Sequence, residues 1–265
     1  MMDKKHFLLE SVTVSSKSIA YSIDKLLSGM IVAAKINNFY AAHEIESIVD
    51  NCNQIGFRWF DNLSLGYIGV SISEHLSMPN GKSEYFDQIS KFYMNLDLIF
   101  CRNNNPTDKL LNLLKKSFSC GIAFDANYQN FYAPGIIEAQ MKGRLIHIDG
   151  SRQPSVLPGC KPINELSVVL YLQAPEKGGE LQIFNKEEEP SDKYREVTFE
   201  PNEREKLLEQ VCQNRENILI QPNAGDLIIF ANCYYHQVWP SEGKKYRIAY
   251  LSSIYSIDSN LVIWV

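Results

Sequence analysis

The sequence predicts an all-β core with flanking helices, arranged as a double-stranded β-helix, the cupin-like jelly roll. After about residue 121, short runs of β-branched and aromatic residues alternate with turn residues, a pattern typical of antiparallel sandwiches and barrels. Before that point the pattern is mixed α and β. We therefore expect one domain, 1–265, with a support region over about 1–120 and a jelly-roll core over about 121–265.

The support region is expected to contain one strand and three helices. Residues 30–36 (MIVAAKI) form an apolar run of strand length, and apolar residues recur at helical spacing after Asn38. Two more helices are predicted over 83–100 and 107–118, the second preceded by a proline that suits a helix start. The glycine-broken aromatic stretch 57–73 allows no assignment.

The core is expected to contain eight strands, because apolar runs of strand length are separated by turn residues. Strong turn signals lie at 176–179 (EKGG) and 222–226 (PNAGD). The predicted strands are 135–140, 144–149, 166–173, 180–184, 218–222, 226–231, 236–239 and 246–253.

The segment 186–214 interrupts this strand pattern, because it is acidic at its start and helical afterwards. It is either a solvated insertion or a mobile lid over a binding site.

Composition narrows the classes of function. The 265 residues are 45% apolar, enough for one substantial core, and the net charge is −5 without a basic cluster. We therefore expect no nucleic-acid partner. The chain shows no signal-peptide or membrane-span pattern, and its six cysteines are scattered singly, without CxxC pairs. We expect a cytoplasmic protein with reduced thiols and no membrane partner, of open oligomeric state.

Three residues form a candidate metal site. His147 and Asp149 alternate at the end of the predicted strand 144–149, so their side chains share one face. His236 begins a later predicted strand. Each residue alone is more often structural, but two imidazoles and one carboxylate make the facial triad of non-haem iron(II) sites, whose open positions suit a bidentate oxoacid and oxygen.

Arg247 is the candidate anchor for the far carboxylate of such an oxoacid, because a guanidinium matches a carboxylate through two parallel hydrogen bonds. It lies 11 residues after His236, across the turn 241–244. We expect hairpin closure to bring Arg247 back alongside the strand of His236.

The C-terminal half contains, in order, the blocks 166–172 (LSVVLYL), 177–181 (KGGEL), 222–230 (PNAGDLIIF), His236 and 243–247 (GKKYR). In these blocks it resembles the 2-oxoglutarate/iron(II) oxygenases of the prolyl-4-hydroxylase-like branch. Residues 29–32 (GMIV), Tyr132-Ala133-Pro134 and 178–184 (GGELQIF) carry a weaker resemblance, to the cyanobacterial oxygenases that halogenate indole alkaloids, and this one reaches the N-terminal region.

The resemblance implies iron(II), 2-oxoglutarate and O2 as cofactors, with His147, Asp149 and His236 as metal ligands. Those halogenases have glycine at the carboxylate position, where chloride binds, so Asp149 implies hydroxylation. Many relatives carry a second cosubstrate contact, a serine, where this chain has Ala249. Tyr132 is a candidate hydroxyl partner for the cosubstrate instead.

In the family mechanism, a ferryl species abstracts hydrogen from a C–H bond, and hydroxyl returns to the carbon. We therefore expect a hydroxylase of a small molecule such as an amino acid or natural-product intermediate. Trp239 and Tyr67 are candidates for the substrate wall, with ordinary core packing as the alternative. Desaturation, epimerisation or cyclisation, protein side-chain hydroxylation and a non-catalytic jelly-roll binding module remain alternatives.

Overall fold

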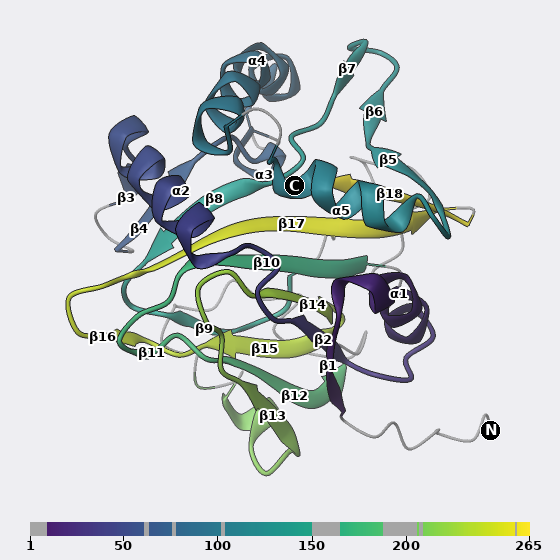
Figure 1. Ribbon diagram of the computed structural model, residues 1–265, viewed down its shortest axis with the longest axis vertical. Helices are drawn as coiled ribbons and strands as arrows, with labels where there is room; N and C mark the ends of the chain where they lie inside the picture. The colour runs from purple at the N-terminus through teal and green to yellow at the C-terminus, as the bar shows by residue number, and fades with distance from the viewer. Residues whose placement is uncertain are drawn as a thin grey trace.

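The computed structural model of the chain contains two facing β-sheets, with helices over the larger one (Figure 1). In Figure 1, α2, α4 and α5 lie on one side of the long strands β10 and β17, and β12, β13 and β15 lie on the other. This two-layer arrangement confirms the predicted all-β core with flanking helices. The structure describes residues 10–60, 64–75, 78–101, 104–149, 165–187, 206, 209–257 and 259–265.

The larger sheet is mainly antiparallel. Its neighbouring strands, in order, are β1 (Ser11–Val14), β2 (Ala33–Ile36), β14 (Leu227–Ala231), β10 (Glu165–Gln173), β17 (Arg247–Ile257), β8 (Ile136–Gln140), β4 (Leu65–Ile68) and β3 (Arg58–Phe60). Two further strands extend it at β17, namely β18 (Asn260–Trp264) and β5 (Ser119–Ile122).

The smaller sheet carries much of the candidate site. Its order is β13 (Asn217–Ile220), β12 (Leu181–Glu187), β15 (Tyr234–Val238) and β9 (Arg144–His147). Two short ladders complete the β-structure, β11 (Lys177–Gly178) with β16 (Ser241–Glu242) and β6 (Phe124–Asp125) with β7 (Asn130–Phe131).

The helices pack through apolar faces. They are α1 (Ile19–Leu27), α2 (Ala42–Ile55), α3 (Ile72–His75), α4 (Gly81–Ile99) and α5 (Pro106–Leu114), with one 3₁₀ turn, η1 (Ser16–Ser18). The start of α5 is capped, since the Asn105 side chain accepts a hydrogen bond from the Thr107 amide. The helix ends at Leu114, before the predicted 118, and the Ser117 amide donates to the carbonyl only three residues earlier, that of Leu114.

The strand predictions are confirmed with shifted ends. All eight predicted core strands are present, but β15 begins at Tyr234, so His236 lies within the strand. The unassigned stretch 57–73 forms β3, β4 and α3, and β18 was not predicted. Of the segment 186–214, residues 188–205 and 207–208 lie outside the described residues. The hypothesis that this segment is a lid therefore stays a prediction.

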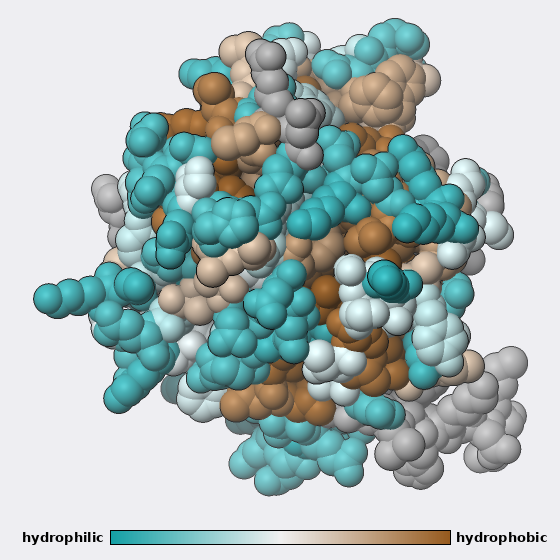
Figure 2. Space-filling view, viewed as in Figure 1, coloured by the Kyte–Doolittle hydropathy of each residue, from teal (hydrophilic) through white to brown (hydrophobic). Residues whose placement is uncertain are grey.

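One cluster of buried apolar side chains runs from Ile19 to Trp264 and includes residues of both sheets and of the helices. Figure 2 shows hydrophilic side chains over much of one face of the molecule, with apolar residues visible between them. Among the described helices, none combines the length and the apolar character that a bilayer crossing requires.

Candidate active site

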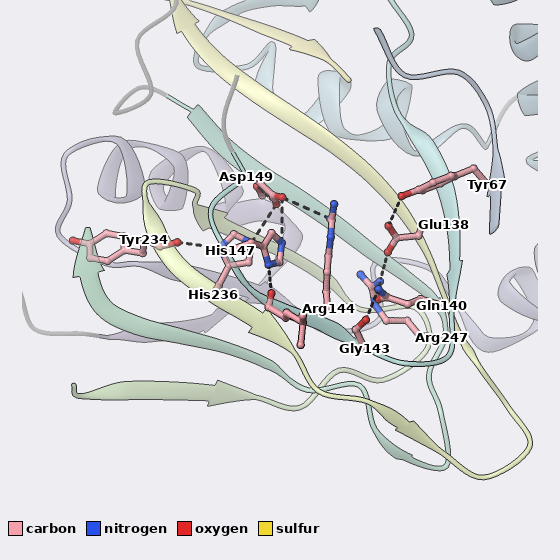
Figure 3. A network of polar contacts seen from close by, with 12 residues as sticks. Tyr67, Glu138, Gln140, Gly143, Arg144, His147, Asp149, Tyr234, His236 and Arg247 are labelled. Atoms are coloured by element: carbon pink, nitrogen blue, oxygen red, sulfur yellow. Dashed lines mark hydrogen bonds and ion pairs between the residues drawn. The ribbon is translucent and has the colours of Figure 1, made fainter. Parts of the chain in front are cut away.

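His147 and His236 face each other across two neighbouring antiparallel strands of the smaller sheet. They are direct register partners of β9 and β15, and their ring centroids lie 4.3 Å apart. Asp149 follows just after β9, with one oxygen 3.4 Å from His147 Nε2 and the other 3.3 Å from His236 Nε2 (Figure 3). The structure therefore brings together the three residues that the sequence singles out.

The hydrogen bonds of the two histidines fix which nitrogen faces the centre. Nδ1 of His147 donates to the Leu145 carbonyl at 2.6 Å, and Nδ1 of His236 donates to the Tyr234 carbonyl at 3.0 Å. A neutral imidazole that donates through Nδ1 keeps a lone pair on Nε2, so both Nε2 atoms are available as ligands.

The charges at the centre favour metal binding. Burial, together with His236 and Arg144, lowers the pKa of His147 to about 4, which keeps this ring neutral. Burial opposes ionisation of Asp149, but its close contacts with His236 and His147 hold its pKa well below the usual range. The Ser167 hydroxyl of β10 also donates to Asp149 at 3.2 Å. A deprotonated carboxylate and neutral imidazoles are the forms that bind metal ions.

The donor set fits a first-row divalent ion. One ligand atom from each of the three residues can be chosen so that all lie within 4.8 Å of one another. Two imidazole nitrogens and one carboxylate oxygen on one side of an ion leave further positions open. A non-catalytic jelly roll without a metal site would not need to bring these three ligand atoms together.

A second group of residues, most of them polar, forms a row across the larger sheet. Strand register places Tyr171 of β10, Ala249 of β17, Glu138 of β8 and Tyr67 of β4 side by side on four adjacent strands. Arg247 lies two residues before Ala249, so its side chain emerges on the same face.

Arg247 is buried in this row, and not all of its side-chain nitrogen atoms have hydrogen-bond partners. Its Nη1 donates to Glu138 Oε1 at 2.7 Å and to Gln140 at 3.4 Å, and its guanidinium lies 5.1 Å from the centre of the Tyr171 ring. Neither Arg247 Nε nor the Tyr171 hydroxyl has a hydrogen-bond partner among the described residues. A buried guanidinium with an unpaired Nε, next to a tyrosine hydroxyl without a partner, fits the far carboxylate of 2-oxoglutarate.

The predicted route to this position was wrong. Arg247 does not lie alongside the strand of His236, because β17 pairs with β10, β8 and β18, whereas β15 pairs with β12 and β9. The short β11–β16 ladder directs the chain from the smaller sheet to the larger one before β17 begins. Arg247 therefore reaches the site from the facing sheet.

Two other predicted site residues lie away from the triad. Tyr132 is fully buried, and its hydroxyl donates to Asp125 at 2.8 Å within a cluster that includes Trp264. Trp239 is 46% exposed and donates from Nε1 to Gln182, which places it on the outer face of the smaller sheet. Alternation along β15 directs His236 to the opposite face.

Tyr67 does lie in the polar network, since its hydroxyl donates to Glu138 at 3.3 Å (Figure 3). No sequence pattern singled out Glu138, Tyr171 or Arg144 as site residues. A carboxylate inside the apolar strand 135–140 was a usable signal for Glu138, because a buried charge requires a partner. Tyr171 carried no such signal, since its position opposite Ala249 depends on register.

Comparison with known proteins assigns the family. Residues 6–260 match the model of a family described as carrier-protein-independent halogenase WelO5. The chain belongs to this family. It is therefore an iron(II)- and 2-oxoglutarate-dependent oxygenase, using O2 as the third cofactor, in agreement with the triad and the Arg247 row.

Solved structures share the fold of this WelO5-family chain. An N-substituted L-amino acid dioxygenase from Burkholderia ambifaria AMMD, in complex with α-ketoglutarate, has a TM-score of 0.64 at 14% identity, covering 93% of this chain and 91% of that one. A second structure with that description, without the ligand in its name, has a TM-score of 0.63 with the same identity and coverage. No curated protein sequence matches the chain.

Proposed function

We propose that this WelO5-family enzyme hydroxylates a small molecule, with His147, Asp149 and His236 as its metal ligands. The observation that carries the proposal is the position of the Asp149 carboxylate, whose two oxygens lie 3.4 and 3.3 Å from the two histidine Nε2 atoms. The carboxylate supplies a third protein ligand. By the resemblance described above, chlorination requires that position for chloride, so Asp149 favours oxygen insertion.

The chain's own residues have separate tasks in this reaction. The Nε2 atoms and the Asp149 carboxylate would hold iron, and the backbone carbonyls behind each Nδ1 keep both rings in the required tautomer. Arg247 and Tyr171 would hold the far carboxylate of 2-oxoglutarate. When bound, iron, 2-oxoglutarate and O2 supply the oxidant for a C–H bond and yield succinate and carbon dioxide. The protein has to position that bond and exclude water.

Two observations support an amino acid or natural-product intermediate as substrate. The family description names an activity that is independent of a carrier protein, which is consistent with a free small molecule. The dioxygenase of similar fold acts, by its description, on N-substituted L-amino acids.

The test has two parts. Anaerobic titration should show iron(II) binding, and with 2-oxoglutarate the protein should form succinate only when O2 is present. Absence of both would contradict the proposal. A screen of amino acids and scaffolds for stimulated succinate release then identifies a substrate, and product mass identifies the outcome. Gain of one oxygen supports hydroxylation, loss of two hydrogens indicates desaturation or cyclisation, and an unchanged mass indicates epimerisation.

The variant Asp149→Gly tests the role assigned to the carboxylate. If Asp149 excludes chloride, the wild-type enzyme gives no chlorinated product in chloride buffer. The variant, if it still binds iron, should respond to chloride in its absorption spectrum. A chlorinated wild-type product would contradict the proposed outcome.

A further inference from the structure

We propose that Arg144 recognises a carboxylate on the primary substrate, which makes this enzyme selective for acids over their neutral analogues. This inference rests on the proposed function. It starts from a local irregularity of β9, which turns an arginine towards the metal centre.

The irregularity is a β-bulge between β9 and β15. The step from His236 to Val238 is two residues, but their register partners, His147 and Arg144, are three residues apart. In a regular strand, residues three apart point to opposite faces. The extra residue in β9 removes this alternation, so Arg144 can turn to the face of His147. Figure 3 shows its side chain between Asp149 and the Glu138–Tyr67 pair.

Of the two arginines at the site, Arg144 is the one with fewer polar contacts and more exposure to solvent. Arg247 is 3% exposed and holds Glu138 at 2.7 Å, whereas the Arg144 side chain is 40% exposed. Arg144 Nη1 lies 3.7 Å from Asp149 Oδ1, which is within range of an ion pair but too far for a hydrogen bond. Among the described residues, its guanidinium donors therefore have no hydrogen-bonded acceptor.

Metal binding changes the balance of charge around Arg144. A divalent ion held by Asp149 takes up the charge of that carboxylate, which is the nearest anion to Arg144. The far carboxylate of 2-oxoglutarate is accounted for by Arg247 and Tyr171, and its other end by the metal. The Arg144 guanidinium then lies beside a metal ion, with free hydrogen-bond donors and access to solvent. Such a group is suited to bind one more planar anion.

A carboxylate of the substrate is the occupant that fits these contacts. Held at Arg144, it would lie close to the metal ligand Asp149 and thus place neighbouring C–H bonds near the reacting centre. The same chemistry is present in 2-oxoglutarate itself, so the experiment has to separate the two sources.

The experiment is calorimetric titration of the full chain, loaded anaerobically with iron(II). 2-Oxoglutarate is titrated first, to measure its affinity. Matched pairs of N-acylated amino acids and their primary amides, such as N-acetyl-L-leucine and N-acetyl-L-leucinamide, are titrated next, with aliphatic and aromatic side chains represented. The proteins are wild type, Arg144→Gln, Arg144→Lys and, as the matched control, Arg58→Gln, which removes another partly exposed, ion-paired arginine.

In the wild type and in Arg58→Gln, we expect at least one acid to bind roughly 10-fold more tightly than its amide. Arg144→Gln should abolish this preference, and Arg144→Lys should retain part of it, because lysine keeps the charge without the planar fork. The affinity for 2-oxoglutarate should remain unchanged in all four proteins.

Three results would overturn the inference. The first is a wild-type protein that shows no preference for an acid, including the case in which no acid binds. The second is a preference for the acid that persists in Arg144→Gln, and the third is a loss of 2-oxoglutarate affinity in Arg144→Gln, which would assign Arg144 to the cosubstrate. Failure of the proposed function is distinguishable, since the wild type would then neither bind iron nor form succinate.

Discussion

The two ends of the site differ in how they are built. The metal end comes from two paired strands of the smaller sheet and is partly open, with the Asp149 side chain 33% exposed. The Arg247 end comes from four adjacent strands of the larger sheet and is closed, with Glu138 and Arg247 exposed by 1% and 3%. An open end can exchange ligands, whereas a closed end must balance its charges internally. Stability should therefore depend on the closed end and metal affinity on the open one.

The largest effect is expected when the buried ion pair of the closed end, Arg247 with Glu138, is broken. Glu138→Ala leaves Arg247 buried without its anion, which should lower the free energy of unfolding by about 3–5 kcal/mol. Urea unfolding measures this change. Glu46→Ala, on an exposed helix position, is the control and should change stability by no more than about 0.5 kcal/mol. If Glu138→Ala were as stable as the control, the pair would not be an internally balanced unit.

The second effect is expected at the metal end alone. Asp149→Ala removes a metal ligand, so iron(II) affinity in an anaerobic titration should fall by at least about 100-fold, more than loss of an outer-shell contact. The unfolding midpoint of the metal-free protein should change far less than in Glu138→Ala, since Asp149 is partly exposed. Glu242→Ala, which removes an exposed carboxylate on β16, should leave iron affinity unaltered.

A third, smaller effect compares two buried tyrosines. Tyr171→Phe should raise the KM for 2-oxoglutarate by roughly 10-fold, through loss of one hydrogen bond to a charged group. It should not destabilise the apoprotein, because this hydroxyl has no partner among the described residues.

Tyr132→Phe should do the reverse. Its hydroxyl donates to Asp125, so stability should fall by about 1 kcal/mol while the KM for 2-oxoglutarate stays constant. A raised KM in Tyr132→Phe, with none in Tyr171→Phe, would return the cosubstrate role to Tyr132.

The last effect is a pH dependence outside the site. Burial opposes ionisation of Asp125, but Lys82, the Tyr132 hydroxyl and two backbone amides lower its pKa to about 2. The folded state therefore binds this proton less readily than the unfolded state, so the stabilisation is present above about pH 4 and is lost as pH falls towards 2. Urea midpoints across this range should fall less steeply in Asp125→Asn. Equal slopes would show that Asp125 does not contribute.

Much of the open end was readable from the sequence. His147 and Asp149 lie two residues apart at a strand end, and strand periodicity places them on one face whatever the rest of the fold does. The approximate positions of all eight core strands followed from the same periodicity and from turn residues. These features are local, so sequence patterns record them.

The closed end depended on tertiary structure. Which strand lies beside β17 is a matter of sheet topology, and a shift of one residue in register would move Tyr171 and Glu138 to the other face. The same holds for Arg144, because only its pairing with Val238 reveals the bulge that turns it. Local periodicity thus specified the ligand types and spacing of the metal end. The partners of Arg247 and the position of Arg144 were decided by long-range pairing, which no local pattern contains.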